Sequence, residues 1–250
     1  HNPLQALQSD VEQMSHMSGH NLQVYAGMIA ALDRSVGKVV EKLKDLEIYG
    51  KTLIIFTSDN GGANYIELED INKPYRGWKI SFFEGGIRVP YIVSWPDEIN
   101  SGQKSDSPVH HFDIFSTIAA AAKVTPSNEK EIDGVNLLPF IKKEKLSQPH
   151  KTLFWRSGNH QSVLHENWKY IISKKENIRW LFDTSKDPLE KNNIIDNHPK
   201  EINLIEGLLS KFNSEQKEPL FPSAYEVPIL IDKYDGQKYE EGDDYIYWSN

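Results

Sequence analysis

The fold of this chain is decided by the stretch Thr52-Leu53-Ile54-Ile55-Phe56-Thr57-Ser58-Asp59-Asn60-Gly61-Gly62. Its first six residues form a largely apolar, β-branched run bounded by glycines, which is typical of a strand that is covered on both faces. In an open α/β sheet, functional residues lie just beyond the carboxyl ends of such strands. The pattern therefore predicts a buried strand over residues 52–57 that delivers Asp59 and Asn60 to one edge of a sheet.

The Asp59-Asn60 pair offers oxygen donors and no imidazole. Oxygen ligands suit a hard cation such as calcium. The two glycines that follow allow the backbone to turn tightly or to approach a ligand closely. All four residues also favour turns, so the tetrapeptide alone favours a simple turn over a cation site.

The segment over residues 73–96 contains two further motifs, R-G-x-K at residues 76–79 and F-E-G-G-x-R-V-P at residues 83–90. A second apolar strand is predicted over residues 91–95. The order of strand, T-S-D-N-G-G, R-G-x-K and F-E-G-G-x-R-V-P resembles that of the formylglycine-dependent sulfatases, which belong to the alkaline-phosphatase superfamily.

This resemblance implies a role for each motif residue. Asp59 and Asn60 would bind the active-site calcium ion, and Lys79 would contact the sulfate group. The start of the chain is similar to the end of the family's P-H-x-P element, whose histidine contacts the sulfate and the leaving oxygen, so His1 joins Lys79 as a candidate catalytic residue. Arg76 lies three residues before Lys79 and is a further candidate for substrate binding.

The family's nucleophile motif, C-x-P-S-R or S-x-P-S-R, is absent from the sequence, which contains no cysteine. The Asp-Asp pair that completes the family's metal site is also absent, and in the family both lie upstream of P-H-x-P. The chain therefore resembles the C-terminal portion of a sulfatase. The resemblance implies that the formylglycine comes from a missing N-terminal half, which would be a partner, and that this chain alone is inactive.

The expected fold class is α/β, with part of an alkaline-phosphatase-like sheet sandwiched by helices and a small C-terminal antiparallel α+β subdomain. We place the C-terminal half of the catalytic domain at residues 1–148 and the subdomain at residues 149–250, because residues 142–150 are polar and contain a proline. Apolar residues recur every three or four positions over residues 22–46, which predicts an amphipathic helix packed on a sheet. Residues 63–72 are acidic and are interpreted as a solvated surface loop, with an acidic lid or a further calcium site as the alternatives.

Beyond residue 149, short aromatic or β-branched runs alternate with turn residues, which predicts an antiparallel meander. These runs cover residues 152–156, 161–164, 168–173 and 180–183. A helix over residues 200–212 is expected to cover one face of this sheet. The tail is rich in tyrosine, proline and acids; packing is its default role, and lining a sugar subsite is the alternative.

Composition excludes some functions. A net charge of −8 disfavours nucleic acid as a partner, since phosphate backbones are bound by clustered Lys and Arg. No run of about 18 apolar residues is present, so we expect no membrane span. The N-terminus lacks the features of a signal peptide, and a periplasmic or secreted location is implied only by the family resemblance.

The resemblance implies a sulfuric ester hydrolase that removes sulfate from a sulfated polysaccharide or oligosaccharide, such as the algal galactan carrageenan. One alternative is a phosphatase or phosphodiesterase of the same superfamily. Those enzymes use zinc or manganese and place His after the Asp of the motif, whereas Asn60 favours calcium and sulfate. The other alternative is a non-catalytic fragment that binds carbohydrate or another partner.

Overall fold

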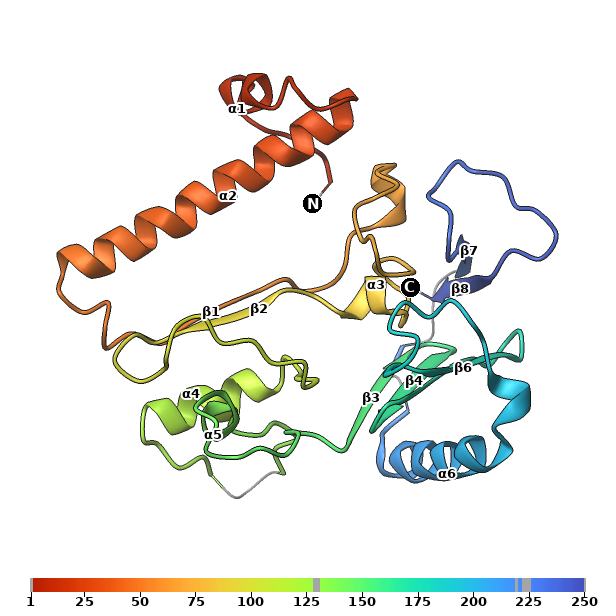
Figure 1. Ribbon diagram of the computed structural model, residues 1–250. Helices are drawn as coiled ribbons and strands as arrows, with labels where there is room; N and C mark the ends of the chain where they lie inside the picture. Colours follow the sequence, from red (N-terminus) through yellow and green to blue (C-terminus); the bar gives the residue numbers. More distant parts are fainter. Residues whose placement is uncertain (1, 128–130, 219, 222–225, 250) are drawn as a thin grey trace. The chain divides into compact units, whose positions relative to one another are not determined.

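The computed structural model describes residues 2–127, 131–218, 220–221 and 226–249 (Figure 1). The chain forms two compact units. The first unit comprises residues 1–27, 58–89 and 152–250, and the second unit comprises residues 28–57 and 90–151. The chain combines helices with sheets, as the expected α/β class requires. The boundary predicted at residues 148–149 stays a prediction.

The second unit contains the strand that leads into the Asp-Asn motif. Strand β1 (Ile54–Thr57) pairs antiparallel with β2 (Tyr91–Ser94). Helices α4 (Asp113–Ala121) and α5 (Leu138–Ile141) follow. The predicted burial of residues 52–57 on both faces is wrong, because every residue of β1 is only half-buried. The physical reason is that the hydrophobic clusters found among the described residues include no residue of β1, so neither face of the strand is packed against a core.

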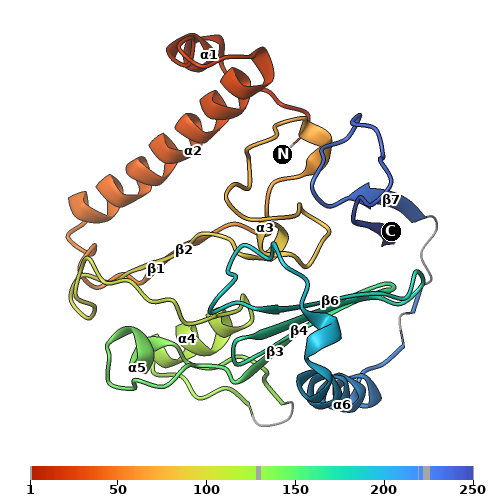
Figure 2. The same ribbon diagram turned by 45° about the vertical axis from the view of Figure 1, so that its right-hand side comes forward.

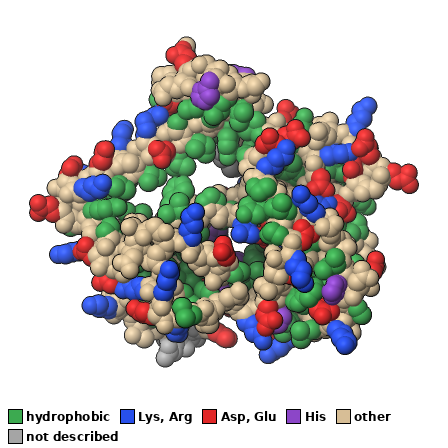
Figure 3. All heavy atoms as spheres, in the orientation of Figure 1, with side chains coloured by type: hydrophobic (Ala, Val, Ile, Leu, Met, Phe, Trp, Pro, Cys, Tyr) green, Lys and Arg blue, Asp and Glu red, His purple; other side chains and the backbone are tan. Residues whose placement is uncertain are grey.

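Helix α2 (His20–Asp45) confirms the helix expected from the apolar periodicity. Its apolar side chains are nevertheless not packed on a sheet, since Ile29, Leu32 and Val39 are all exposed. Figure 3 shows such hydrophobic side chains at the surface along this helix. Within the part of the chain that the structure describes, none of the helices combines the length and the apolar character needed to cross a bilayer.

The first unit is built around a four-stranded antiparallel meander, which confirms the sequence prediction. Its strands follow one another in the order β3 (Thr152–Ser157), β4 (His160–His165), β5 (Trp168–Ser173) and β6 (Ile178–Asp183). The remaining elements of this unit are α1 (Gln8–Gln13), η1 (Asn64–Ile66), α3 (Glu84–Ile87), η2 (Ile195–Asn197), α6 (Pro199–Glu215), β7 (Glu226–Leu230) and β8 (Tyr245–Ser249).

One face of the meander is covered by α6, as predicted (Figure 2). Because side chains alternate between the faces of a strand, Val163, Tyr170 and Leu181 point to the same side. These three residues form a buried cluster with Ile205 and Leu209 of α6. Burying such a face on a helix is what allows a small sheet to be stable.

The opposite face of the meander holds the loop before α3 and the C-terminal hairpin, which is formed by the antiparallel pair β7 and β8. Phe83 is fully buried, and its ring lies 5.3 Å from the ring of Trp180 and 6.0 Å from that of Phe182. Ile231 and Ile246 join the same cluster, so the tail packs as its default role required. The sheet thus fixes Phe83, the residue directly before Glu84-Gly85-Gly86.

His160, at the start of β4, is 3% exposed, and its Nε2 lies 2.9 Å from the hydroxyl of Ser173. Burial lowers the pKa of His160 below its ordinary value of 6.5, against the opposing effects of Glu176 and Glu226. The folded state therefore favours the neutral imidazole. The imidazole of His160 therefore binds a proton more readily in the unfolded chain than in the folded one. Its contribution to the stability of the folded state is present above pH 6.5 and is lost as the pH falls below that value.

We predict that the melting temperature of the purified protein falls between pH 7.5 and pH 5.5, and that His160→Gln reduces this fall. The measurement is thermal unfolding by circular dichroism at both pH values. His16→Gln, which changes an exposed histidine, should keep the pH dependence of the unmodified protein. An equal fall in His160→Gln and the unmodified protein would contradict the assignment.

Candidate functional site

The Asp59-Asn60 pair occupies a tight loop that begins directly after β1. The backbone N–H of Asn60 donates to Asp59 Oδ1 at 3.0 Å, and the hydroxyl of Ser58 donates to the carbonyl of Asn60 at 2.9 Å. Asn60 Nδ2 donates to the carbonyl of Gly61 at 2.9 Å. Asp59 is exposed, so the loop is held by its own hydrogen bonds while the carboxylate faces solvent.

Glycines let three motifs touch through their backbones. The N–H of Gly61 donates to the carbonyl of Gly86 at 2.9 Å, and the N–H of Gly85 donates to the carbonyl of Arg76 at 2.7 Å. A Cβ atom at Gly61 would overlap the carbonyl oxygen of Gly85. A Cβ atom at Gly85 would likewise overlap the carbonyl oxygen of Gly77. The absence of side chains therefore brings D-N-G-G, R-G-x-K and E-G-G into direct contact.

Asn72 clamps two of these motifs together, a role that the sequence analysis missed. Its Oδ1 accepts from the N–H of Gly62 at 2.7 Å, and its Nδ2 donates to the carbonyls of Gly62 at 2.9 Å and Gly77 at 3.0 Å. The N–H of Lys79 also donates to the carbonyl of Gly62, at 2.8 Å. The backbone of Lys79 is thus hydrogen-bonded to Gly62, which lies two positions after Asn60.

The interpretation of residues 63–72 as a solvated loop is wrong for part of the segment. Ala63, Asn64 and Ile66 are 7%, 4% and 7% exposed. The physical reason is that the clamp by Asn72 draws the end of the segment back onto the glycine loop, so that its apolar residues are covered. The acidic side chains do face solvent, as expected: Glu67, Glu69 and Asp70.

Lys79 sits on a strained turn. Ile80 has a φ angle of +90°, a conformation that is rare for a β-branched residue. The turn is closed by Ser81, whose N–H and hydroxyl both donate to the carbonyl of Trp78, at 3.0 and 2.9 Å. The ammonium group of Lys79 has no hydrogen-bond or ion-pair partner among the residues that the structure describes. Backbone strain of this kind gathers at functional sites, where surrounding contacts maintain it.

Arg76 is already occupied by carboxylates. Its guanidinium binds Asp232 through two hydrogen bonds of 2.7 and 2.6 Å, binds Asp244 at 2.5 Å, and donates to the carbonyl of Glu190 at 3.3 Å. Burial would lower the pKa of Arg76, but the two carboxylates outweigh burial and raise it. The structure therefore uses Arg76 to hold the C-terminal hairpin, and its role in substrate binding stays a prediction.

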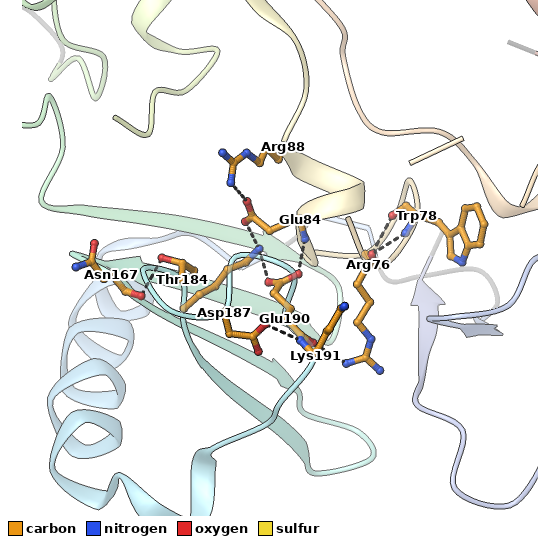
Figure 4. A network of polar contacts seen from close by, with 11 residues as sticks. Arg76, Trp78, Glu84, Arg88, Asn167, Thr184, Asp187, Glu190 and Lys191 are labelled. Carbon is orange, nitrogen blue, oxygen red and sulfur yellow. Dashed lines mark hydrogen bonds and ion pairs between the residues drawn. The ribbon is translucent and has the colours of Figure 1, made fainter. Parts of the chain in front are cut away.

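A buried ion network fixes the E-G-G turn to the meander (Figure 4). Lys169 of β5 is fully buried, and its Nζ lies 2.6 Å from Glu84 Oε1 and 2.7 Å from Glu190 Oε1. The second oxygen of Glu190 accepts from the N–H of Glu84 at 2.6 Å. Arg88 Nη1 lies 3.3 Å from Glu84 Oε2, so these two residues form an ion pair.

The three buried groups of this network shift one another's pKa values. Burial alone would lower the pKa of Lys169, but Glu190 and Glu84 outweigh burial and raise it. Burial opposes ionisation of Glu84, yet Lys169 and Arg88 lower its pKa overall. The pKa of Glu190 is raised by burial, since Lys169 only partly offsets it and Glu84 adds to it. The two carboxylates share one ammonium, and Glu84 also has Arg88, which explains the opposite shifts.

The remaining predicted site residues are His1, Asp59 and Asn60. His1 lies outside the described residues. No group of three or more His, Cys, Asp or Glu side chains suited to a metal ion occurs over residues 2–127, 131–218, 220–221 and 226–249. Calcium takes six to eight oxygen ligands. Asp59 and Asn60 fit as donors of two of them, and their predicted roles stay predictions.

We predict that Gly61→Ala destabilises the purified protein by about 2 kcal/mol, because overpacking typically costs 1–3 kcal/mol and the added methyl meets the backbone of Gly85. The matched control is Gly207→Ala in α6, where a Cβ meets nothing within 4 Å. That control should be neutral or stabilising by about 0.5–1 kcal/mol, since alanine favours a helix. Urea unfolding measures both, and equal effects at the two positions would contradict the predicted backbone contact.

Comparisons with known proteins place these motifs in a family. The family model described as Sulfatase matches residues 1–124. The family model described as N-sulphoglucosamine sulphohydrolase, C-terminal, matches residues 77–218, which is more than half of the chain. The two matches together cover all the motifs discussed above except the C-terminal hairpin.

Individual sulfatases agree with this assignment. Human steryl-sulfatase is 36% identical over 214 residues, which cover 68% of this chain and 36% of that protein. The chain thus spans about a third of the length of this curated relative. The PsFucS1 sulfatase of Pseudoalteromonas sp. has a similar fold, with a TM-score of 0.63 and 21% identity over 88% of this chain and 48% of that one.

A higher structural similarity is found to Ps i-CgsB, with a TM-score of 0.80 and 30% identity. The match covers 88% of this chain and 49% of that chain. Ps i-CgsB has also been solved in complex with k-i-k-neocarrahexaose. The expected fold class is therefore confirmed. Family models, a curated relative and solved structures all lead to one conclusion: the chain belongs to the sulfatase family.

Proposed function

We propose that this chain forms the C-terminal portion of a sulfuric ester hydrolase that removes sulfate from a sulfated polysaccharide or oligosaccharide. A sulfated algal galactan such as carrageenan is the substrate class that we favour. The similarity to Ps i-CgsB, which has been solved with a carrageenan hexasaccharide, supports this choice. Asn60 in place of a histidine after Asp59 supports a sulfate ester over a phosphate ester.

The observation that carries the proposal is the ammonium group of Lys79. It has no partner among the described residues, it lies next to a strained backbone position, and its own backbone is bonded to the loop of Asp59 and Asn60. Other lysines nearby are paired with carboxylates, as Lys169 is with Glu84. An unpaired cation in a constrained position is suited to binding an anionic group.

In the proposed mechanism, a hydrated formylglycine would come from the N-terminal half and would supply the nucleophile for the sulfur atom. Lys79 neutralises the charge that develops on the non-bridging sulfate oxygens as the transition state forms. His1, when protonated, stabilises or protonates the departing sugar oxygen. Asp59 and Asn60 would hold calcium, which would supply Lewis-acid polarisation of the sulfate oxygens when bound.

The proposed partner is the N-terminal half of the same enzyme. Exposed apolar side chains on the second unit support this partner, since large exposed apolar residues commonly mark interaction surfaces. They are Ile29, Leu32, Val39, Ile92, Phe115 and Ile118. We also propose that the intact enzyme is exported to the periplasm or secreted, because its proposed substrate is a polysaccharide outside the cell.

We predict that Lys79→Ala in the full-length enzyme lowers kcat/KM for a sulfated galactan oligosaccharide by about 100- to 1,000-fold, the usual effect of removing one charge-stabilising donor. The control is Lys73→Ala, which removes an exposed lysine that pairs with Asp70 and lies six residues earlier. Sulfate release measured by ion chromatography gives both rates. The same assay on a phosphate ester of the sugar tests the alternative ester class.

Undiminished sulfate release by Lys79→Ala would eliminate the role assigned to this residue. Faster hydrolysis of the phosphate ester than of the sulfate ester by the unmodified enzyme would overturn the choice of substrate.

A further inference from the structure

The C-terminal hairpin and its long connection line an open pocket of about 480 Å³ in the first unit. This volume falls in the range of about 300–1,000 Å³ that is usual for small-ligand sites. The pocket is lined by Asn64 of η1 and by residues of β7, β8 and the connection between them. Figures 1 and 2 both show this connection beside the segment that contains η1.

Tyrosine rings form a row on the lining of this pocket. The ring of Tyr245 lies 6.3 Å from that of Tyr239 and 5.9 Å from that of Tyr247, both in edge-to-face geometry. Tyr239 is 60% exposed. Tyrosine combines a flat apolar ring with a polar hydroxyl, which matches a sugar ring with its apolar C–H face and polar edge.

A buried acceptor lines the same pocket. Asn64 is only 4% exposed, and its Oδ1 accepts no hydrogen bond from any residue that the structure describes. A buried polar atom without a partner is costly, typically by about 1–3 kcal/mol. Asn64 is one of the lining residues of the pocket, and a shift of its side chain that exposes Oδ1 would let it accept a hydrogen bond from a ligand hydroxyl.

The connection that forms the pocket is held in place at both ends. Arg76 binds Asp232 at its start and Asp244 at its end, and the N–H of Asp235 donates to the carbonyl of Asn64 at 3.2 Å. Lys233 braces the connection from within through Glu240 and Asp243. A site that is already ordered loses less conformational entropy when a ligand binds.

The charged residues that line the pocket indicate which part of a substrate can bind in it. Lys233 is the one cationic residue among its lining residues, and its ammonium lies 2.8 Å from Glu240 and 2.7 Å from Asp243. Asp235 also lines the pocket and adds a negative charge. Among the described lining residues, no cation is therefore left to bind a sulfate group. The chemistry favours an uncharged sugar ring over a sulfated one.

We infer that this pocket, here called the tyrosine pocket, binds an unsulfated sugar ring of the same polysaccharide chain whose sulfated ring is the substrate. This inference rests on the proposed function. Tyr239 and Tyr245 supply apolar ring faces, and Asn64 accepts a hydrogen bond from a sugar hydroxyl. The pocket thereby makes the enzyme select a saccharide chain over a simple sulfate ester.

The test compares two substrates in the full-length enzyme, a sulfated carrageenan hexasaccharide and p-nitrophenyl sulfate. We expect Tyr239→Ala to raise KM for the hexasaccharide about tenfold relative to KM for p-nitrophenyl sulfate. Tyr239→Phe keeps the ring and should restore the hexasaccharide KM. Asn64→Leu, which has a similar shape and no acceptor, should raise the same KM ratio by about fivefold. Melting temperatures establish that each variant is folded.

Direct binding separates this inference from the proposed function. Isothermal titration with a chemically desulfated carrageenan hexasaccharide should show tenfold weaker binding by Tyr239→Ala than by the unmodified enzyme. If the unmodified enzyme released no sulfate but this loss of binding were seen, the proposed function would fail and the pocket would stand. Unchanged binding and an unchanged KM ratio in both Tyr239→Ala and Asn64→Leu would overturn the pocket. If Asn64→Leu lowered the melting temperature, the binding and the KM ratio of Tyr239→Ala, which changes an exposed residue, would decide whether the pocket binds the sugar ring.

Discussion

The buried ammonium of Lys169 is the interaction on which the candidate site depends. It joins Glu84, at the start of α3, to Glu190, in the segment after β6. Phe83, one residue earlier, is held by rings of the meander. The E-G-G turn that follows is therefore fixed by charge and by packing at once. Because Gly61 contacts this turn through its backbone, the position of the Asp59-Asn60 loop depends on the C-terminal sheet.

The lysines of this chain differ in their ion-pair partners. This difference distinguishes lysines that stabilise the fold from a lysine that is available to bind a ligand. Lys169 is fully buried between two carboxylates, and breaking such a pair typically costs about 3–5 kcal/mol because charges remain buried without a partner. Lys233 braces a connection through two acids. Lys79 has no such partner among the described residues. Arg76 lies between these cases, since it is charged, close to Lys79 in sequence and already bound to Asp232 and Asp244.

Much of the fold was predictable because it follows from local patterns. The meander over residues 152–183, helix α6 and the helix over residues 20–45 all follow hydrophobic periodicity and turn residues. The Glu84–Arg88 pair follows from opposite charges four positions apart.

The clamp by Asn72 and the ion network around Lys169 could not be predicted, since each joins residues distant in sequence and carries no local pattern. The positive φ angle of Ile80 contradicts its residue type, so only the structure could show it. The half-burial of β1 could not be predicted from its sequence. An apolar run indicates which residues can be buried, whereas the topology of the fold decides which elements cover them.

The most direct test of this account is hydrogen–deuterium exchange at the amide of Gly61, which donates to the carbonyl of Gly86. The measurement compares the unmodified full-length enzyme with Lys169→Met and with Lys186→Met, which removes an exposed lysine paired with Asp183 on the same sheet. If the buried ion network positions the loop, the Gly61 amide exchanges at least tenfold faster in Lys169→Met and at the unmodified rate in Lys186→Met. An unchanged rate at Gly61 in a folded Lys169→Met protein would contradict the claim that the C-terminal sheet holds the candidate site.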